Sequence, residues 1–115
     1  MARVGEVGPD DGYRVLVDRL WPRGVRKDAQ YWDEWLKDVA PSADLRRWYN
    51  HDPARYEEFR RRYWDELRHP ARSAALEHLR QLARERPLVL LTATRDVARS
   101  QAPILAAYLE ADPEP

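Results

Sequence analysis

The chain has 115 residues and a mass of 13.6 kDa, a length that suits one domain with one hydrophobic core. Its 20 basic and 20 acidic residues leave a formal net charge of zero, so nothing attracts it generally to nucleic acid or to anionic membranes. It has no cysteine, which excludes disulfides, thiolate catalysis and cysteine-ligated zinc. Its three histidines, His51, His69 and His78, have no ligand spacing, so neither a metal nor a cofactor is expected. No apolar run is long enough to span a membrane, and we expect a cytoplasmic protein with no membrane partner.

The N-terminal quarter predicts two strands joined by a turn. Residues 2–7 are expected to form a short strand. Pro9-Asp10-Asp11-Gly12 has the composition of a turn, because proline presets φ and glycine tolerates a positive φ. Residues 13–18 alternate between two faces with the two-residue period of a pleated strand, and Pro22, which cannot donate to a sheet ladder, lies beyond its end. The turn predicts a hairpin between these two strands.

Helical spacing dominates the middle of the chain. Residues 31–39 place apolar side chains at intervals of three and four, which predicts a helix with core-packed tryptophans; these side chains are Trp32, Trp35, Leu36 and Val39. Ser42 is a good N-cap for a short helix that follows. Asp52-Pro53 then opens the clearest helix of the chain. Its inward stripe is Tyr56, Phe59, Tyr63 and Leu67.

The C-terminal third predicts a helix, a strand and a last helix. The helix ends at Arg86-Pro87, and the wholly apolar residues 88–91 predict a central strand buried on both faces. Residues 97–109 form the last helix, in which Pro103 either marks a true start near Ala102 or causes a kink. Residues 111–115 are expected to fray.

These elements predict an α/β fold in a single domain, residues 1–115. The expected architecture is a small mixed or parallel sheet of about three strands, packed with about five helices. A right-handed crossover makes the strands at 13–18 and 88–91 parallel neighbours. Their carboxyl ends then meet at one sheet edge, where ligands of open α/β sheets bind.

Two polar loops follow these strands and carry the candidate ligand-binding residues. The first loop supplies Arg19, Trp21, Arg23 and Gly24, and the second supplies Thr94, Arg95, Asp96 and Ser100. Arginines near a helix N-terminus favour an anion. We expect Asp18 to pair with a loop arginine, Arg19 foremost, and to hold the loop. Trp21 either stacks on a planar ligand or plugs the edge of the core, and the second interpretation is favoured.

Three functions fit these residues. The leading hypothesis is a protein that binds a small anionic molecule, bearing phosphate or carboxylate, at the strand ends. The first alternative is an enzyme acting on a phosphorylated or carboxylated metabolite, with Asp18 or His51 as general base. The second is a module that binds protein or nucleic acid through arginines such as Arg60, Arg61 and Arg62, although acidic residues on the same helix argue against nucleic acid.

The segment Asp18-Arg19-Leu20-Trp21-Pro22-Arg23-Gly24 resembles the YeaO-like branch of a bacterial family of proteins of unknown function. The resemblance extends over nearly the whole chain, through His51-Asp52-Pro53 to Arg95-Asp96. It implies a compact cytoplasmic α/β fold and no established activity, substrate or cofactor. Distant relatives often carry a cysteine near Thr92 and a cysteine-histidine-arginine group where this chain has Arg99-Ser100, so a thiol or metal role at those positions does not transfer.

Overall fold

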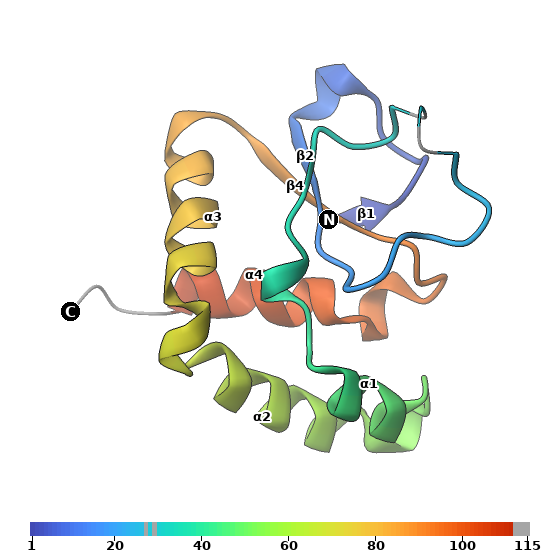
Figure 1. The fold of residues 1–115 in the computed structure, drawn as a ribbon, viewed down its shortest axis with the longest axis vertical. Helices are drawn as coiled ribbons and strands as arrows, with labels where there is room; N and C mark the ends of the chain where they lie inside the picture. The colour runs from blue at the N-terminus through green and yellow to red at the C-terminus, as the bar shows by residue number, and fades with distance from the viewer. Residues whose placement is uncertain (27, 29, 112–115) are drawn as a thin grey trace.

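The computed structural model describes residues 1–26, 28 and 30–111. These residues build a mixed α/β structure around one small sheet (Figure 1). The sheet has four parallel strands in the order β1-β4-β2-β3. They are β1 (Ala2–Arg3), β2 (Tyr13–Leu16), β3 (Glu34–Trp35) and β4 (Leu88–Thr92).

The two central strands, β2 and β4, are parallel neighbours, as the sequence predicts. Tyr13 lies opposite Leu88, and Leu16 lies opposite Leu91. Val15, Leu16 and Leu91 are fully buried, in keeping with a sheet covered on both faces. Since the strands run in the same direction, both leave the sheet at the same edge. This arrangement brings the two polar loops together.

The predicted hairpin between the first two strands is wrong. β1 pairs with β4 instead of β2, with Ala2 opposite Leu91. A short 3-10 turn, Pro9–Asp11, leads from β1 towards Gly12. Gly12 has φ +139°, and a Cβ there would lie 2.9 Å from the Pro87 carbonyl oxygen. A glycine at this position permits the close approach with which β2 begins beside β4, and β1 pairs along the other edge of β4.

The predicted helix at residues 31–39 is also wrong. The segment forms the edge strand β3 and a 3-10 turn, Lys37–Val39. The Leu36 amide donates to the Leu16 carbonyl at 2.9 Å, and the Asp33 amide donates to the Arg14 carbonyl at 2.8 Å. The backbone groups on the free side of β2 therefore recruit the segment as a strand. As a result the described residues form four strands and four α-helices, against the predicted three and five.

The four helices are α1 (Ala43–Tyr49), α2 (Tyr56–Leu67), α3 (Ser73–Glu85) and α4 (Gln101–Ala111). The predicted N-cap of α1 is confirmed, because the Ser42 side chain accepts a hydrogen bond from the Leu45 amide at 3.1 Å. α4 begins at Gln101, so Pro103 lies in its first turn and does not kink it. The predicted frayed tail lies outside the described residues, except Ala111, which ends α4.

Helix α2 supplies much of the core and lies beside α4 in Figure 1. Phe59, Tyr63 and Leu67 are buried as predicted, whereas Tyr56 is only half-buried. The Tyr63 hydroxyl donates to the Val39 carbonyl, and burial raises the pKa of Tyr63, so the phenol stays neutral. The core thus fastens α2 to the segment that leads into α1, which forms one side of the pocket described next.

Candidate functional site

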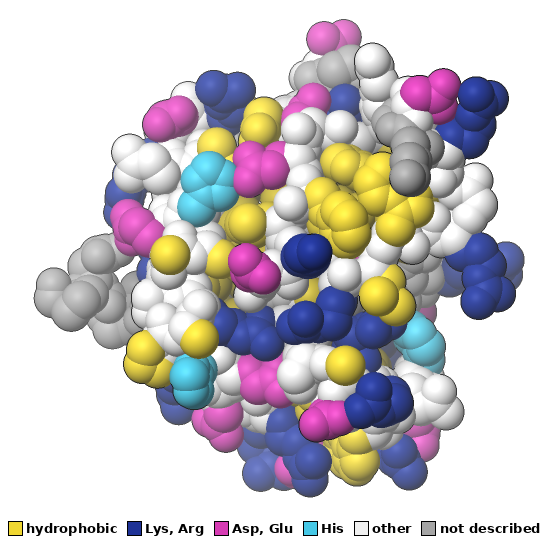
Figure 2. Space-filling model, in the orientation of Figure 1, with side chains coloured by type: hydrophobic (Ala, Val, Ile, Leu, Met, Phe, Trp, Pro, Cys, Tyr) yellow, Lys and Arg dark blue, Asp and Glu magenta, His cyan; other side chains and the backbone are white. Residues whose placement is uncertain are grey.

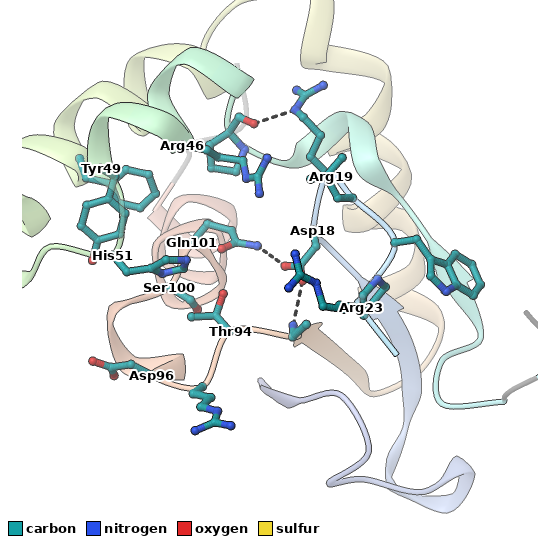
Figure 3. A pocket seen from close by; sticks show the side chains of 17 residues that line it. Asp18, Arg19, Arg23, Arg46, Tyr49, His51, Thr94, Asp96, Ser100 and Gln101 are labelled. Atoms are coloured by element: carbon teal, nitrogen blue, oxygen red, sulfur yellow. Dashed lines mark hydrogen bonds between the residues drawn. The ribbon is translucent and has the colours of Figure 1, made fainter. Parts of the chain in front are cut away.

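A pocket of about 730 Å³ lies beyond the carboxyl ends of β2 and β4. The loops after these strands form two of its sides, and α1 with the turn after it forms the third (Figure 3). Its lining includes almost every predicted site residue: Asp18, Arg19, Trp21, Arg23, His51, Thr94, Arg95, Asp96 and Ser100. Arg46, Tyr49, Phe59 and Gln101 also line it. The predicted convergence of the two loops is therefore present in the structure.

Asp18 joins the two loops, but not through an arginine. Its carboxylate accepts hydrogen bonds from the Thr92 hydroxyl at 2.8 Å, the backbone amide of Ala93 at 2.8 Å and the side-chain amide of Gln101 at 2.6 Å. The Gln101 amide also donates to the Val17 carbonyl at 3.2 Å. The expected Asp18–Arg19 ion pair is wrong, because neutral donors from the β4 end and the α4 start occupy the carboxylate. Asp18 therefore connects β2, β4 and α4.

Arg19 supports the wall of the pocket. Its Nε donates to the Pro41 carbonyl at 2.9 Å, and Figure 3 shows its guanidinium turned away from Asp18. This bond ties the loop after β2 to the segment that precedes α1. Arg19 thus ties the loop to the segment before α1 through a backbone carbonyl, and not through the expected ion pair with Asp18.

Trp21 belongs to an aromatic cluster beside the pocket. Its ring meets Trp32 and Trp35 edge to face, with centroids 4.9 and 5.6 Å apart, and its Nε1 donates to the Val25 carbonyl at 2.7 Å. These contacts favour the interpretation that Trp21 plugs the edge of the core. Trp32 and Trp35 do pack, although on a loop and a strand instead of the predicted helix. Gly24 does not line the pocket; its φ of +81° forms the turn that follows Pro22.

Three arginines of the pocket have no protein partner in the part of the chain that the structure describes. Arg23 follows β2, Arg46 lies on α1 and Arg95 follows β4; all three are exposed. Within the described residues none of their guanidinium groups makes a hydrogen bond or an ion pair. By contrast, Arg47, the neighbour of Arg46 on α1, points outside the pocket lining and pairs with Asp44. Unpaired guanidinium groups around one cavity are suited to oxyanions, which they grip bidentately.

An aromatic wall closes the α1 side of the pocket. Tyr49 and Phe59 stack with centroids 4.0 Å apart, and the His51 ring lies 6.4 Å from Tyr49. His51 and Asn50 both have left-handed φ angles, 53° and 48°, so the chain turns sharply after α1. Figure 3 shows the His51 ring directed towards Ser100 and Gln101. The strained turn thus delivers an imidazole into the pocket.

The loop after β4 lines another side of the pocket and is held by hydrogen bonds. The Tyr49 hydroxyl donates to the Arg99 carbonyl at 2.7 Å, and burial raises the pKa of this phenol, which keeps it a neutral donor. The Thr94 amide donates to the Thr92 hydroxyl at 3.1 Å, and the Ser100 hydroxyl donates to the Val97 carbonyl at 2.8 Å. Asp96 precedes a 3-10 turn, Val97–Arg99, and does not cap this turn with its side chain; the side chain pairs with Arg99 at 3.1 Å instead.

Sequence reasoning missed Arg46, Tyr49 and Gln101. Arg46 and Tyr49 lie on the short helix that follows Ser42, and nothing in the sequence of this helix says that it faces the strand ends. Gln101 had one signal, its place at the start of the helix that follows the polar loop. Among the described residues, no three His, Asp or Glu side chains group as metal ligands would. Within the same residues, no helix is both long and apolar enough to cross a bilayer.

The fold and the pocket define a small parallel α/β protein with an arginine-lined cavity at its strand ends. Residues 2–114 match the family model described as "Inactive DUF488-N3 subclade", so the chain belongs to this family. The predicted relationship to YeaO is confirmed: the chain is 38% identical to YeaO of Escherichia coli K12 over 99 residues, 86% of this chain and 84% of YeaO.

Mycobacterial proteins are also similar to the chain. Rv3073c of Mycobacterium tuberculosis H37Rv and Mb3100c of Mycobacterium bovis are each 54% identical over 110 residues, which cover 95% of this chain and 91% of theirs. Each of these relatives, YeaO included, bears a name that calls it uncharacterized. No solved structure matches the chain.

Proposed function

We propose that this chain is a cytoplasmic binding protein for a small organic anion that bears phosphate or carboxylate. The anion occupies the pocket at the carboxyl ends of β2 and β4. Arg23, Arg46 and Arg95 bind its oxygens, and Asp18 and Arg19 keep the two loops in position. The observation that carries the proposal is the set of three arginines without a protein partner in the described structure around one cavity.

The geometry favours a ligand over a structural purpose for these arginines. A guanidinium that stabilises the fold is held by carbonyls or carboxylates, as Arg19 is by the Pro41 carbonyl and Arg14 by Asp33. Arg23, Arg46 and Arg95 have no such contacts with the residues that the structure describes, and they surround a volume within the range of small-molecule pockets. The chain as a whole is neutral, so this concentration of positive charge is a local feature of the pocket.

Binding without turnover fits the residues better than catalysis. As a general base, Asp18 would have to take a proton while its oxygens already accept three hydrogen bonds. His51 is the other candidate base and reaches the pocket, but no side chain among the described residues donates or accepts a hydrogen bond that would orient its imidazole. The family description, "Inactive DUF488-N3 subclade", agrees with a binding protein.

The test measures thermal unfolding with rising glucose 6-phosphate, with gluconate as a carboxylate probe and with glucose as the uncharged control, all at one ionic strength. A ligand that binds only the folded state raises Tm with concentration according to its Kd. We expect glucose 6-phosphate or gluconate to raise Tm, and glucose to leave it unchanged.

Matched variants locate the effect. Arg46→Gln and Arg47→Gln remove neighbouring exposed charges of α1, but only Arg46 lines the pocket. We expect Arg46→Gln, Arg23→Gln and Arg95→Gln to keep the Tm of the free protein and lose most of the anion-induced rise. Arg47→Gln should retain the full rise. Equal losses in Arg46→Gln and Arg47→Gln, or no rise with either anion in the unaltered chain, would refute the proposal.

A further inference from the structure

The pocket is too large for a single oxyanion. Its volume of about 730 Å³ compares with roughly 30 Å³ for one water molecule in the liquid. A phosphate or carboxylate group has only a few heavy atoms and leaves most of this space open. A ligand that fills the pocket therefore has a body as well as an anionic group.

The three arginines without a partner among residues 1–26, 28 and 30–111 are distributed around the cavity. Arg23 belongs to the loop after β2, Arg95 to the loop after β4, and Arg46 to helix α1, so no two of them share an element. Figure 3 shows Arg46 and Arg23 reaching the pocket from different elements, one from the α1 side and one from the β2 loop. One oxyanion gripped bidentately occupies one or two guanidiniums, which leaves at least one more cationic position.

The charge of the lining points the same way. Four arginines against two aspartates leave the lining with a net charge of +2 when His51 is neutral. The negative charges are already engaged, since Asp18 accepts three neutral donors and Asp96 pairs with Arg99. The lining therefore has the charge to neutralise two carboxylates, or roughly half of the charge of two phosphates. In the orientation of Figure 1, Figure 2 shows a row of Lys and Arg side chains on the viewed face, between the sheet and helices α1 and α2.

We propose that the ligand carries two separated oxyanionic groups on one body, as a sugar bisphosphate or a dicarboxylate does. This inference rests on the proposed function. Once the first group is held, the second binds at high effective concentration, so its contribution exceeds that of a second free anion.

The test is calorimetric titration of the full chain with ligands matched in their body. Fructose 1,6-bisphosphate and fructose 6-phosphate differ by one phosphate, and glutarate and butyrate differ by one carboxylate. At matched ionic strength we expect the two-anion member of at least one pair to bind about tenfold tighter or more. The pair that shows this preference identifies phosphate or carboxylate as the group recognised. Pyrophosphate, whose charges are adjacent, should bind more weakly than the bisphosphate if phosphate is recognised.

Variants test whether both groups use the arginines. Arg46→Gln and Arg23→Gln should each reduce the affinity ratio between the two-anion and the one-anion ligand of a pair to about one. Arg47→Gln and the exposed loop variant Arg26→Gln should preserve this ratio. Equal affinities within both pairs, with monoanions still bound, would overturn this inference and leave the proposed function intact. Pyrophosphate binding as tightly as the bisphosphate, with phosphate the recognised group, would overturn the separation of the two groups. No binding by any probe would overturn both proposals.

Discussion

At the scale of single residues, Asp18 has a different role from the one that its neighbours in the sequence suggest. An aspartate beside Arg19 and near Arg23 invites an ion pair. The structure instead gives its carboxylate three neutral donors, drawn from Thr92, Ala93 and Gln101. The sequence could predict that Asp18 fastens the two loops, because both strands end nearby. It could not predict the partners, because Gln101 is 83 residues away.

Asp18→Asn should therefore destabilise the fold by about 1–3 kcal/mol, the cost of leaving a half-buried donor unsatisfied. This loss is smaller than the one expected for an orphaned buried arginine, roughly 3–5 kcal/mol, because no arginine loses its partner. Urea unfolding measures the difference in the free energy of unfolding. The control is Asp96→Asn, which breaks an exposed pair with Arg99 and should cost under about 1 kcal/mol. Equal effects of the two variants would show that Asp18 does not fasten the loops.

At the scale of elements, β3 belongs to a segment whose local pattern predicts a helix but which forms a strand because it pairs with β2. Residues 31–39 have helical spacing, yet a helix there would leave the backbone groups on one side of β2 without partners. Ser42 and Asp52, by contrast, cap their helical turns as predicted, since a cap depends only on residues within one turn. The sequence feature that could have indicated β3 is Arg14, because a charged residue on a buried strand needs a partner from a neighbouring segment. Arg14 is 4% exposed and makes two side-chain bonds to Asp33, both at 3.2 Å.

This pair predicts a specific dependence of stability on pH. The hydrogen bonds from Arg14 hold the pKa of Asp33 below its usual value. Because the folded-state pKa is lowered, the pair stabilises the fold fully above the unfolded pKa of about 4, and this contribution is lost as the pH falls through the lowered value. Asp33→Asn should cost about 1–2 kcal/mol at neutral pH, a modest figure because the Asp33 side chain is 32% exposed.

Urea unfolding of both proteins from neutral to strongly acidic pH checks the prediction. The difference between the chain and Asp33→Asn should be constant down to about pH 5 and should shrink below about pH 4. Asp28→Asn is the control, since Asp28 pairs with Arg26 on the exposed surface. A difference that grows on acidification would mean that the sign of the linkage is wrong.

At the scale of the whole molecule, the topology places the pocket. The two central parallel strands, β2 and β4, end at one edge of the sheet, and the chain that connects them places helix α1 at that same edge. The sequence predicted the meeting of the two loops from strand direction alone. The contribution of α1 depends on how three consecutive helices pack, which no local pattern encodes.

An apolar patch lies beside the row of cationic side chains in Figure 2, over the segment between β2 and β3. Leu20, Trp21 and Tyr31, which belong to this segment, are exposed apolar side chains.

Because the chain has no net charge, the attraction of an anion depends on the charges near the pocket, and the effect of salt on affinity measures this attraction. Raising the salt concentration from about 0.05 to about 0.5 M shortens the screening length from roughly 14 to roughly 4 Å, so charges across the molecule lose their influence while contacts in the pocket keep part of theirs. We expect the affinity for the anionic sugar phosphate to fall several-fold over this range. Arg46→Gln should weaken binding and flatten this salt dependence, because it removes one of the charges that the salt screens. Arg47→Gln should change the affinity and its slope much less, since Arg47 lies outside the pocket and acts on the ligand only through a screened long-range charge. If the two variants flattened the slope equally, attraction would come from the general surface of α1, and the arginines of the pocket would have no special part in binding.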